Sequence, residues 1–264
     1  MTQTNSILPF GVEQVAGIPF QVLNLDEAVH WTLNTAAKEH LAVNVRLGNA
    51  WTVALAHDDA SYFRLLTEQG VNFPDGTPVV WFMNVGRPGV TRAGQVRGPS
   101  FFARVLKEGV RSGTRHFLLG GSPCTIESLK ETLAHRYPGC EIAGAYSPPF
   151  APVDDGYIRD CVDRVRSARA DLVWVGLGTP KQDVVGTALA EELGITTLNV
   201  GAAFDFAAGT VREAPVWIQS SGLEWLYRLA CEPRRLHRRY VYGNARFLWA
   251  ATKAHVTRRW RRAE

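Results

Sequence analysis

The stretch "DLVWVGLGTPKQ", residues 171–182, contains the pattern that decides the fold. A run of apolar residues is followed by Gly176 and Gly178, where the backbone can turn sharply, and by Pro180, where a helix can begin. An uninterrupted apolar run of this length is typical of a strand that is buried on both faces. The stretch therefore predicts a buried strand, a tight turn and a helix that starts near residue 181.

The same alternation recurs along the chain. Further strands are expected at "LAVNV" (41–45), "HFLLGG" (116–121), "CEIAGAY" (140–146) and "TTLNVGAA" (196–203). Helical patterns occupy residues 58–69, 98–112, 124–136, 154–168 and 181–193. Apolar strands that alternate with amphipathic helices favour a mostly parallel sheet with helices on both faces. The predicted fold class is therefore Rossmann-like α/β.

Two of the expected strands end in glycine just before a helix start, in "LLGGSP" (118–123) and "VGLGTPKQ" (175–182). Such turns present backbone N–H groups at the positive end of a helix, which suits a pyrophosphate. In open α/β sheets, ligands also gather at the carboxyl ends of the strands. Neither stretch fits the GxGxxG or GxxxxGK[ST] motif, which disfavours a dinucleotide dehydrogenase or an ATPase. A plain tight turn is the alternative interpretation.

The charge of the chain is distributed unevenly. Its 264 residues are 46% hydrophobic and 10% aromatic, which is enough for a packed core. Residues 228–262 hold eleven Lys and Arg against one acid, Glu232, a net charge of +10. The remainder holds 18 basic and 24 acidic residues, a net charge of −6. A basic tail on an acidic body indicates an anionic partner such as nucleic acid, acidic lipid or a phosphorylated substrate.

Several classes of protein are disfavoured by the sequence, among them disulfide-bonded, secreted, membrane-spanning and metal-binding proteins. The four cysteines form no CxxC pair, which predicts reduced thiols in a cytosolic protein. The chain has no signal-peptide pattern and no apolar run near the ~20 residues of a membrane span, so we expect neither secretion nor integral membrane insertion. No HxH, HxxxH or DxD motif is present, and we expect no metal site. The acidic pairs Asp58–Asp59 and Asp154–Asp155 are interpreted as helix caps.

Two segments contain polar residues that are candidates for a catalytic or binding site. In "NFPDGTPVVW" (72–81), Asp75 either forms a turn or offers a loop carboxylate as a general base. The segment 199–233 places Asp205 after a strand end and then an aromatic-rich helix that carries Arg228. Its large aromatic residues are equally consistent with core packing.

Five motifs, in this order, resemble the bacterial WecG/TagA/CpsF glycosyltransferases over about residues 15–250. They are "FPDGTPVVW", "HFLLGG", "VGLGTPKQ", "VGAAFDFAAGTVREAPVWIQSSGLEWLYRLACEPRRLHRRY" and "GNARFLW". The resemblance implies an inverting transferase that moves an N-acetylmannosamine-type sugar from a UDP-sugar to a polyprenyl-diphosphate-linked acceptor, without metal or cofactor. It also implies a Rossmann-like core over residues 1–232 and a basic helical appendage over residues 233–264.

The resemblance assigns roles to individual residues. Asp75 matches the catalytic base. The expected substrate-binding residues are Asn49, Gly120, Gly121, Gly176, Gly178, Pro180, Lys181, Gln182, Phe204, Asp205, Arg228, Arg235 and Arg238. The chain departs from the family pattern at Leu47, two residues before Asn49, and at Gln95 and Ser100 in "AGQVRGPSFF". These departures leave the choice of sugar donor open.

The basic tail is expected to serve two purposes. As a regular helix, it would gather Arg234, Arg235, Arg238 and Arg239 on one face. The arginines of "RRWRR" (258–262) would meet anionic lipid, which predicts a peripheral protein at the cytoplasmic face of the plasma membrane. A catalytically silent scaffold is the alternative, and the sequence is also compatible with a homo-oligomer. Binding of nucleic acid is disfavoured, because the tail lacks a known motif and the body is acidic.

Overall fold

The computed structural model describes residues 8–85, 91–219 and 221–263, with side chains described up to residue 257. By its internal contacts the chain divides into two compact units. Unit 1 comprises Met1–Leu23, Gly48–Gln95 and Glu213–Glu264, and unit 2 comprises Asn24–Leu47 and Val96–Arg212. The expected division at residue 232 stays a prediction.

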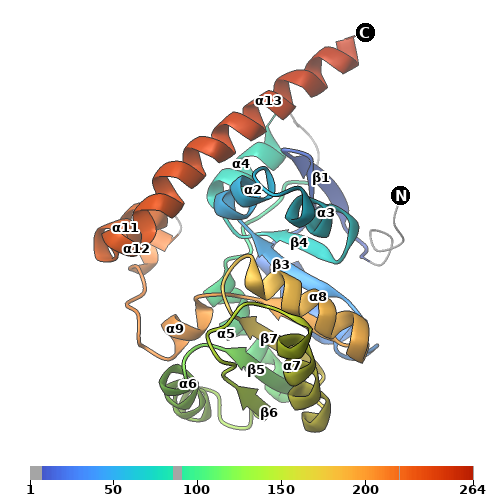
Figure 1. Ribbon diagram of the computed structural model, residues 1–264, viewed down its shortest axis with the longest axis vertical. Coiled ribbons are helices and arrows are strands. Elements are labelled where there is room, and N and C mark those ends of the chain that lie inside the picture. The colour runs from blue at the N-terminus through green and yellow to red at the C-terminus, as the bar shows by residue number, and fades with distance from the viewer. Residues whose placement is uncertain (1–7, 86–90, 220, 264) are drawn as a thin grey trace. The chain divides into compact units, whose positions relative to one another are not determined.

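Strands and short or medium helices alternate through most of the chain (Figure 1). The strands are β1 (Gly11–Val15), β2 (Ile18–Val22), β3 (Asn44–Gly48), β4 (Val71–Pro74), β5 (Arg115–Gly120), β6 (Glu141–Tyr146), β7 (Leu172–Gly176) and β8 (Thr196–Asn199). The helices are α1 (Leu25–Trp31), α2 (Ala50–Ala56), α3 (Ala60–Glu68), α4 (Thr77–Asn84), α5 (Gly98–Gly109), α6 (Pro123–Arg136), α7 (Asp155–Ala168), α8 (Lys181–Leu193), α9 (Ala203–Ala207), α10 (Val216–Gln219), α11 (Glu224–Cys231), α12 (Pro233–His237) and α13 (Gly243–Ala263). The larger sheet has the strand order β4-β3-β8-β7-β5-β6.

Unit 2 is built on the parallel strands β3, β8, β7, β5 and β6. On one face of the sheet, Val173 and Val175 belong to an apolar cluster that includes residues of α7 and α8. Trp174 lies on the other face, because successive strand residues alternate. Its ring contacts Phe101 and Phe102 of α5 at centroid distances of 5.8 and 4.8 Å. Helices cover both faces of this sheet, which confirms the predicted Rossmann-like α/β class.

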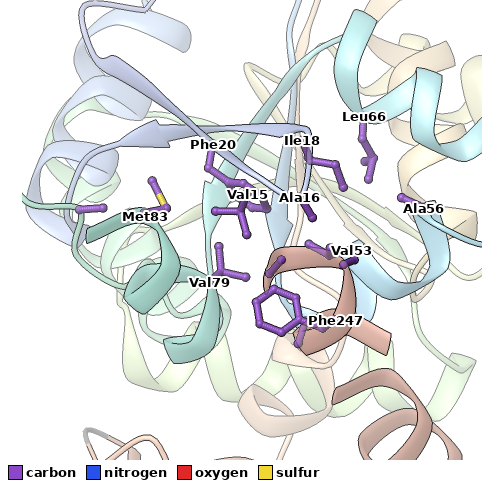
Figure 2. Close-up of a cluster of buried hydrophobic side chains, with 14 of the residues drawn as sticks. Val15, Ala16, Ile18, Phe20, Val53, Ala56, Leu66, Val79, Met83 and Phe247 are labelled. Atoms are coloured by element: carbon purple, nitrogen blue, oxygen red, sulfur yellow. The ribbon is translucent and has the colours of Figure 1, made fainter. Parts of the chain in front are cut away.

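Unit 1 has a core of its own, to which the C-terminal helix contributes (Figure 2). The antiparallel hairpin β1–β2 supplies Val15, Ile18 and Phe20, and α13 supplies Phe247. The Phe247 ring packs edge-on against Phe82, with ring centroids 5.4 Å apart. One face of the first half of α13 is therefore part of a hydrophobic core, because Phe247, Ala250 and Ala251 are buried among the other elements of this unit.

The expected elements agree with the structure except at several places. All five expected strands and all five expected helices are present, and Asp59 and Asp154 cap α3 and α7. The hairpin β1–β2 and the short strand β4 were not expected. The basic segment is also not one regular α-helix, because a π-helical turn at Arg238–Tyr242 separates α12 from α13.

The Asp58 carboxylate binds residues of the C-terminal segment and does not cap a helix. Its carboxylate accepts hydrogen bonds from Tyr242 (2.7 Å) and from Arg246 (2.9 Å) of the C-terminal segment. Arg246 also donates to the backbone carbonyl of His57 at 2.8 Å. These bonds connect the start of α13 to the end of α2, so the prediction of a cap at Asp58 was wrong.

No described helix has the length and hydrophobicity that a bilayer crossing requires. Likewise, the described part of the chain holds no group of three His, Cys, Asp or Glu side chains arranged to bind a metal ion. The side chains of "RRWRR" (258–262) lie outside the described residues.

Candidate active site

Asp75 of unit 1 lies directly after the buried strand β4 and is itself half-buried. Its backbone N–H donates to the carbonyl of Gly48, the last residue of β3, at 2.9 Å. Gly76 then caps α4, and a β-carbon at this position would lie only 3.0 Å from Cβ of Asn49. Glycine suits this position, because a side chain there would press on Asn49. The strand end and this close approach together position the Asp75 carboxylate.

Asn49 holds the Asp75 side chain. Its Nδ2 donates to Oδ2 of Asp75 at 3.2 Å. Asn49 is also the N-cap of α2, and its Oδ1 accepts from the backbone N–H groups of Trp51 (3.1 Å) and Thr52 (3.4 Å). Because these two bonds need the oxygen on the helix side, they orient the amide so that its nitrogen faces the carboxylate. The cap therefore determines which atom Asp75 meets.

Gln95, one of the departures from the family pattern, holds the backbone of the same residue. Its Nε2 donates to the carbonyl oxygen of Asp75, and its Oε1 accepts from Thr77 Oγ1 at 3.4 Å. Asp75 is thus restrained at its side chain by Asn49 and at its main chain by Gln95. A carboxylate held in this way can accept a proton from a substrate hydroxyl with little reorganisation.

The arginines expected to bind substrate differ in their surroundings. Arg228 is half-buried on α11, whereas Arg235 and Arg238 are exposed. Arg235 pairs with Glu232 one turn earlier on the chain. Exposed pairs of this kind contribute little to stability, and water or an anion can replace the partner at small cost.

Arg239 was expected on one helix face with Arg234, Arg235 and Arg238, but its environment differs from theirs. It lies in the π-helical turn Arg238–Tyr242 and is half-buried, with its Nε fully buried. Burial lowers the pKa of its guanidinium below the usual value. A repeat of Arg-Arg pairs cannot indicate which member is buried, because that depends on the unpredicted π-turn.

Unit 2 contains the two glycine turns that the sequence indicated. Gly120 has φ +120°, and a β-carbon there would lie 2.6 Å from the carbonyl carbon of Gly176. Gly121 donates its N–H to the carbonyl of Gly176 at 3.2 Å. A β-carbon at Gly176 would in turn lie 2.7 Å from the ring of Phe204, which is buried. The ends of β5 and β7 therefore approach each other closely, and Phe204 packs beneath them.

A side chain closes the second turn upon itself. The carbonyl oxygen of the buried Gln182 side chain accepts from Gly178 N–H at 3.1 Å, and Gln182 N–H donates back to the Gly178 carbonyl at 2.9 Å. Gly178 has φ +78°, a conformation that favours glycine. Pro180 is the N-cap of α8 and is exposed. Gln182 accordingly shapes the turn at the N-terminus of α8.

Two other expected residues have clear structural surroundings in unit 2. Lys181 donates to the carbonyl of Ala151 at 2.7 Å and lies over the ring of Tyr157, 4.1 Å from its centroid. The backbone carbonyl of Asp205 accepts from Thr210 N–H at 3.0 Å, which closes the turn after α9.

The departures at Leu47 and Ser100 also lie in unit 2. Leu47 is buried on β3, and a β-carbon at Gly98 would lie 3.3 Å from its Cδ1 atom. The Ser100 hydroxyl accepts from Arg97 at 3.4 Å. Leu47 therefore packs against the start of α5, and Ser100 lies in the first turn of that helix.

The structure brings together Asn49, Asp75 and Gln95 in unit 1, and the glycine turns with Phe204 in unit 2. A parallel α/β sheet with glycine turns at its carboxyl edge defines a Rossmann-like protein, a class in which ligands gather at that edge. Residues 13–261 match the family described as "Glycosyl transferase WecG/TagA/CpsF family". The chain belongs to this family of glycosyltransferases and is therefore an enzyme that transfers a sugar from a donor to an acceptor.

Two relatives have names that specify an activity. The chain is 26% identical over 230 residues, 86% of either sequence, to an N-acetylglucosaminyldiphosphoundecaprenol N-acetyl-beta-D-mannosaminyltransferase of Bacillus subtilis (strain 168). It is 29% identical over 212 residues to a protein of the same name from Bacillus spizizenii (strain ATCC 23059 / NRRL B-14472 / W23). That match covers 76% of this chain and 78% of the relative.

Proposed function

We propose that this enzyme transfers an N-acetylmannosamine-type sugar from a UDP-sugar to a polyprenyl-diphosphate-linked sugar, with inversion at the anomeric carbon. The product would serve cell-wall or surface polysaccharide synthesis. The names of the two Bacillus relatives, which specify a mannosaminyl group and an undecaprenyl-diphosphate acceptor, support this reaction. The observation that carries the proposal is the restrained carboxylate of Asp75.

In the proposed reaction, the acceptor hydroxyl oxygen attacks the anomeric carbon of the donor sugar. The bond from that carbon to the diphosphate oxygen breaks, and its electron pair stays on the departing UDP. The hydroxyl proton moves to the Asp75 carboxylate, which acts as the general base. A single displacement of this kind inverts the anomeric centre. Asn49 and Gln95 act through Asp75 as positioning residues, because they hold its side chain and its backbone.

The departing UDP gains negative charge, which the enzyme must stabilise. Arg228, Arg235 and Arg238 are the proposed partners of the diphosphate, because arginine pairs well with phosphate oxygens. For unit 2 by itself, we propose that the positive ends of α6 and α8, which follow the glycine turns, attract a phosphorylated group of a substrate. These roles do not require a divalent cation, and the sequence contains no DxD motif that would hold one.

The acceptor's lipid implies work at a membrane surface. We propose that the basic C-terminal segment binds anionic headgroups at the cytoplasmic face, with the arginines of "RRWRR" (258–262) as the main contacts. Each such arginine contributes about 1 kcal/mol near an anionic surface.

The decisive experiment measures UDP release from candidate UDP-sugars in the presence of a short-chain lipid-diphosphate acceptor. We expect turnover by the wild type and at least a ~100-fold loss in Asp75→Asn, since general-base catalysis contributes roughly that factor or more. Asp163→Asn, a change at an exposed aspartate of α7, is the matched control. Full activity of Asp75→Asn would remove Asp75 as the base. Failure of the wild type with every donor would favour the catalytically silent scaffold.

A further inference from the structure

Among the arginines of the basic segment 233–242, Arg239 has a distinct environment. Arg234, Arg235 and Arg238 are exposed, whereas Arg239 is half-buried. Its Nε atom is fully buried and has no hydrogen-bond partner among the described residues. A buried charged donor without a partner is costly, because its desolvation is not offset by a hydrogen bond. Arg239 therefore requires an explanation that a solvated basic surface does not provide.

The backbone around Arg239 is held in place rather than exposed on a free helix. The π-helical turn Arg238–Tyr242 is followed by Gly243, where a β-carbon would lie 2.8 Å from the ring of Trp51. Further along the same helix, Phe247 is buried in the core of unit 1. Single π-turns within longer helices occur frequently at functional sites. This turn places the Arg239 side chain inward, although its neighbour Arg238 is exposed.

This anchoring connects Arg239 to the candidate base through residues of one unit. Trp51, which Gly243 approaches, lies in the first turn of α2. That helix is capped by Asn49, whose amide holds the Asp75 carboxylate. The π-turn is thus packed against the same helix start that orients Asp75.

The charged groups that affect the Arg239 guanidinium include the carboxylate of Asp75. Burial lowers the pKa of Arg239, and the positive charges of Arg228 and Arg235 lower it further. Tyr240 and the carboxylate of Asp75 act in the opposite direction. The charges that act on Arg239 thus include two further guanidinium groups and the Asp75 carboxylate, and Arg235 in turn pairs with Glu232. An anion bound at Arg239 would offset both the desolvation of this guanidinium and the repulsion from its basic neighbours.

We propose that Arg239 is a substrate-binding residue that holds a phosphate of a diphosphate group beside Asp75. This inference rests on the proposed function. It adds the half-buried Arg239 to the exposed Arg235 and Arg238 as a residue that binds the diphosphate. Its planar guanidinium can donate two parallel hydrogen bonds to phosphate oxygens. The diphosphate belongs either to UDP or to the lipid-linked acceptor, and both groups have the same chemistry at this position.

The test compares two Arg239 variants with a matched surface change. Arg239→Gln removes the charge and keeps part of the stem, whereas Arg239→Lys keeps the charge and loses the planar fork. Arg234→Ala is the control, because Arg234 is exposed in the same basic segment and its loss changes the net charge equally. Thermal unfolding and circular dichroism establish that each variant is folded. If Arg239→Gln does not fold, Arg239→Lys provides the comparison.

Calorimetry at fixed ionic strength measures the affinities for UDP and inorganic pyrophosphate, and turnover measures KM for a short-chain lipid-diphosphate acceptor. If UDP is the source, we expect Arg239→Gln to weaken UDP and pyrophosphate binding roughly 10- to 100-fold, and Arg239→Lys to weaken it less. A similar rise in the acceptor KM with unchanged UDP affinity assigns the lipid diphosphate instead. Arg234→Ala should change each value less than about three-fold, since exposed charges contribute little.

The proposal is overturned if both Arg239 variants match Arg234→Ala in UDP affinity, pyrophosphate affinity and acceptor KM. Absence of any pyrophosphate or UDP binding by the wild type, without an effect on acceptor KM, overturns it as well. These outcomes differ from failure of the proposed function. In that case the wild type would transfer no sugar, yet Arg239→Gln would still lower its affinity for pyrophosphate or UDP.

Discussion

Asn49 Nδ2 lies 3.2 Å from Asp75 Oδ2, and the same amide caps α2 through its oxygen. One side chain therefore serves a helix and a candidate catalytic base. These two contributions can be separated, because serine can cap a helix but has no amide nitrogen to reach the carboxylate.

We expect Asn49→Ala to lower both stability and activity. Loss of the cap should cost about 1 kcal/mol of unfolding free energy. In Asn49→Ser the cap is kept, so stability should stay within about 0.5 kcal/mol of wild type. Turnover should fall at least ~10-fold in both variants, because a misplaced base loses catalytic efficiency. Urea denaturation and UDP release measure the two effects, and wild-type turnover by Asn49→Ser would contradict the positioning role.

Gln95→Ala should lower kcat more than it raises KM. The substitution removes the bond to the Asp75 carbonyl and releases the loop that carries the base. We expect a loss in kcat of roughly 10-fold, equivalent to one hydrogen bond of about 1.4 kcal/mol. Steady-state kinetics provide the measurement, and Gln14→Ala on the exposed side of β1 is the control. An increase in KM alone would indicate that Gln95 binds substrate directly.

Phe247→Ala should destabilise unit 1 strongly, although the residue lies in the C-terminal helix. Phe247 is 1% exposed and packs against Phe82. Truncation of a buried phenylalanine costs about 3–5 kcal/mol. The adjacent Leu248 is 52% exposed, and Leu248→Ala should therefore change stability by less than about 0.5 kcal/mol. Equal effects of both changes on urea denaturation would show that α13 does not pack on this core.

The buried His116 predicts a pH dependence of stability in unit 2. Burial lowers its pKa to about 3, and its Nδ1 accepts a hydrogen bond from Trp174. Between pH ~6.5, the usual pKa, and ~3, the unfolded chain binds a proton that the folded protein does not. The free energy of unfolding should therefore fall as pH decreases through this window, by up to about 1.4 kcal/mol per pH unit.

His116→Gln should flatten this dependence, because the substituted side chain does not titrate. His135→Gln, at an exposed position of α6, should leave the slope unchanged. Urea denaturation between pH 4 and 7 provides the comparison. The same slope in both variants would mean that other groups cause the pH dependence.

Removal of residues 258–264 tests the proposed membrane contact. We expect weaker binding to vesicles that contain anionic lipid, because four arginines are lost and each contributes about 1 kcal/mol. Turnover with a water-soluble acceptor should be unchanged, since the core contact at Phe247 remains. Co-sedimentation with vesicles measures the first effect. Equal vesicle binding by the truncated and the full-length protein would contradict a membrane contact by residues 258–264.

Local sequence signals predicted much of the fold. The strand–turn–helix of "DLVWVGLGTPKQ" is visible because apolar runs, glycines and helix starts act over a few residues. The hairpin β1–β2 and the strand β4 were missed because each is only four or five residues long. The C-terminal segment was expected to be one regular helix, but its π-turn depends on packing rather than on helical propensity.

The candidate site depended much more on distant contacts. The resemblance indicated Asp75 and Asn49, but their hydrogen bond joins residues 26 positions apart. Gln95 appeared only as a departure from the family pattern, whereas the structure places it on the Asp75 carbonyl. No local pattern predicts such a bond, because it forms only when separate loops meet.

The sequence by itself determined the parallel α/β class, the glycine turns and the family, because these depend on short patterns and their order along the chain. Only the tertiary structure decided how Asp75 is held and which arginine of the segment 233–242 is half-buried. Burial and hydrogen bonding are set by which segments pack together, so within one π-turn Arg239 is half-buried while its neighbour Arg238 is exposed.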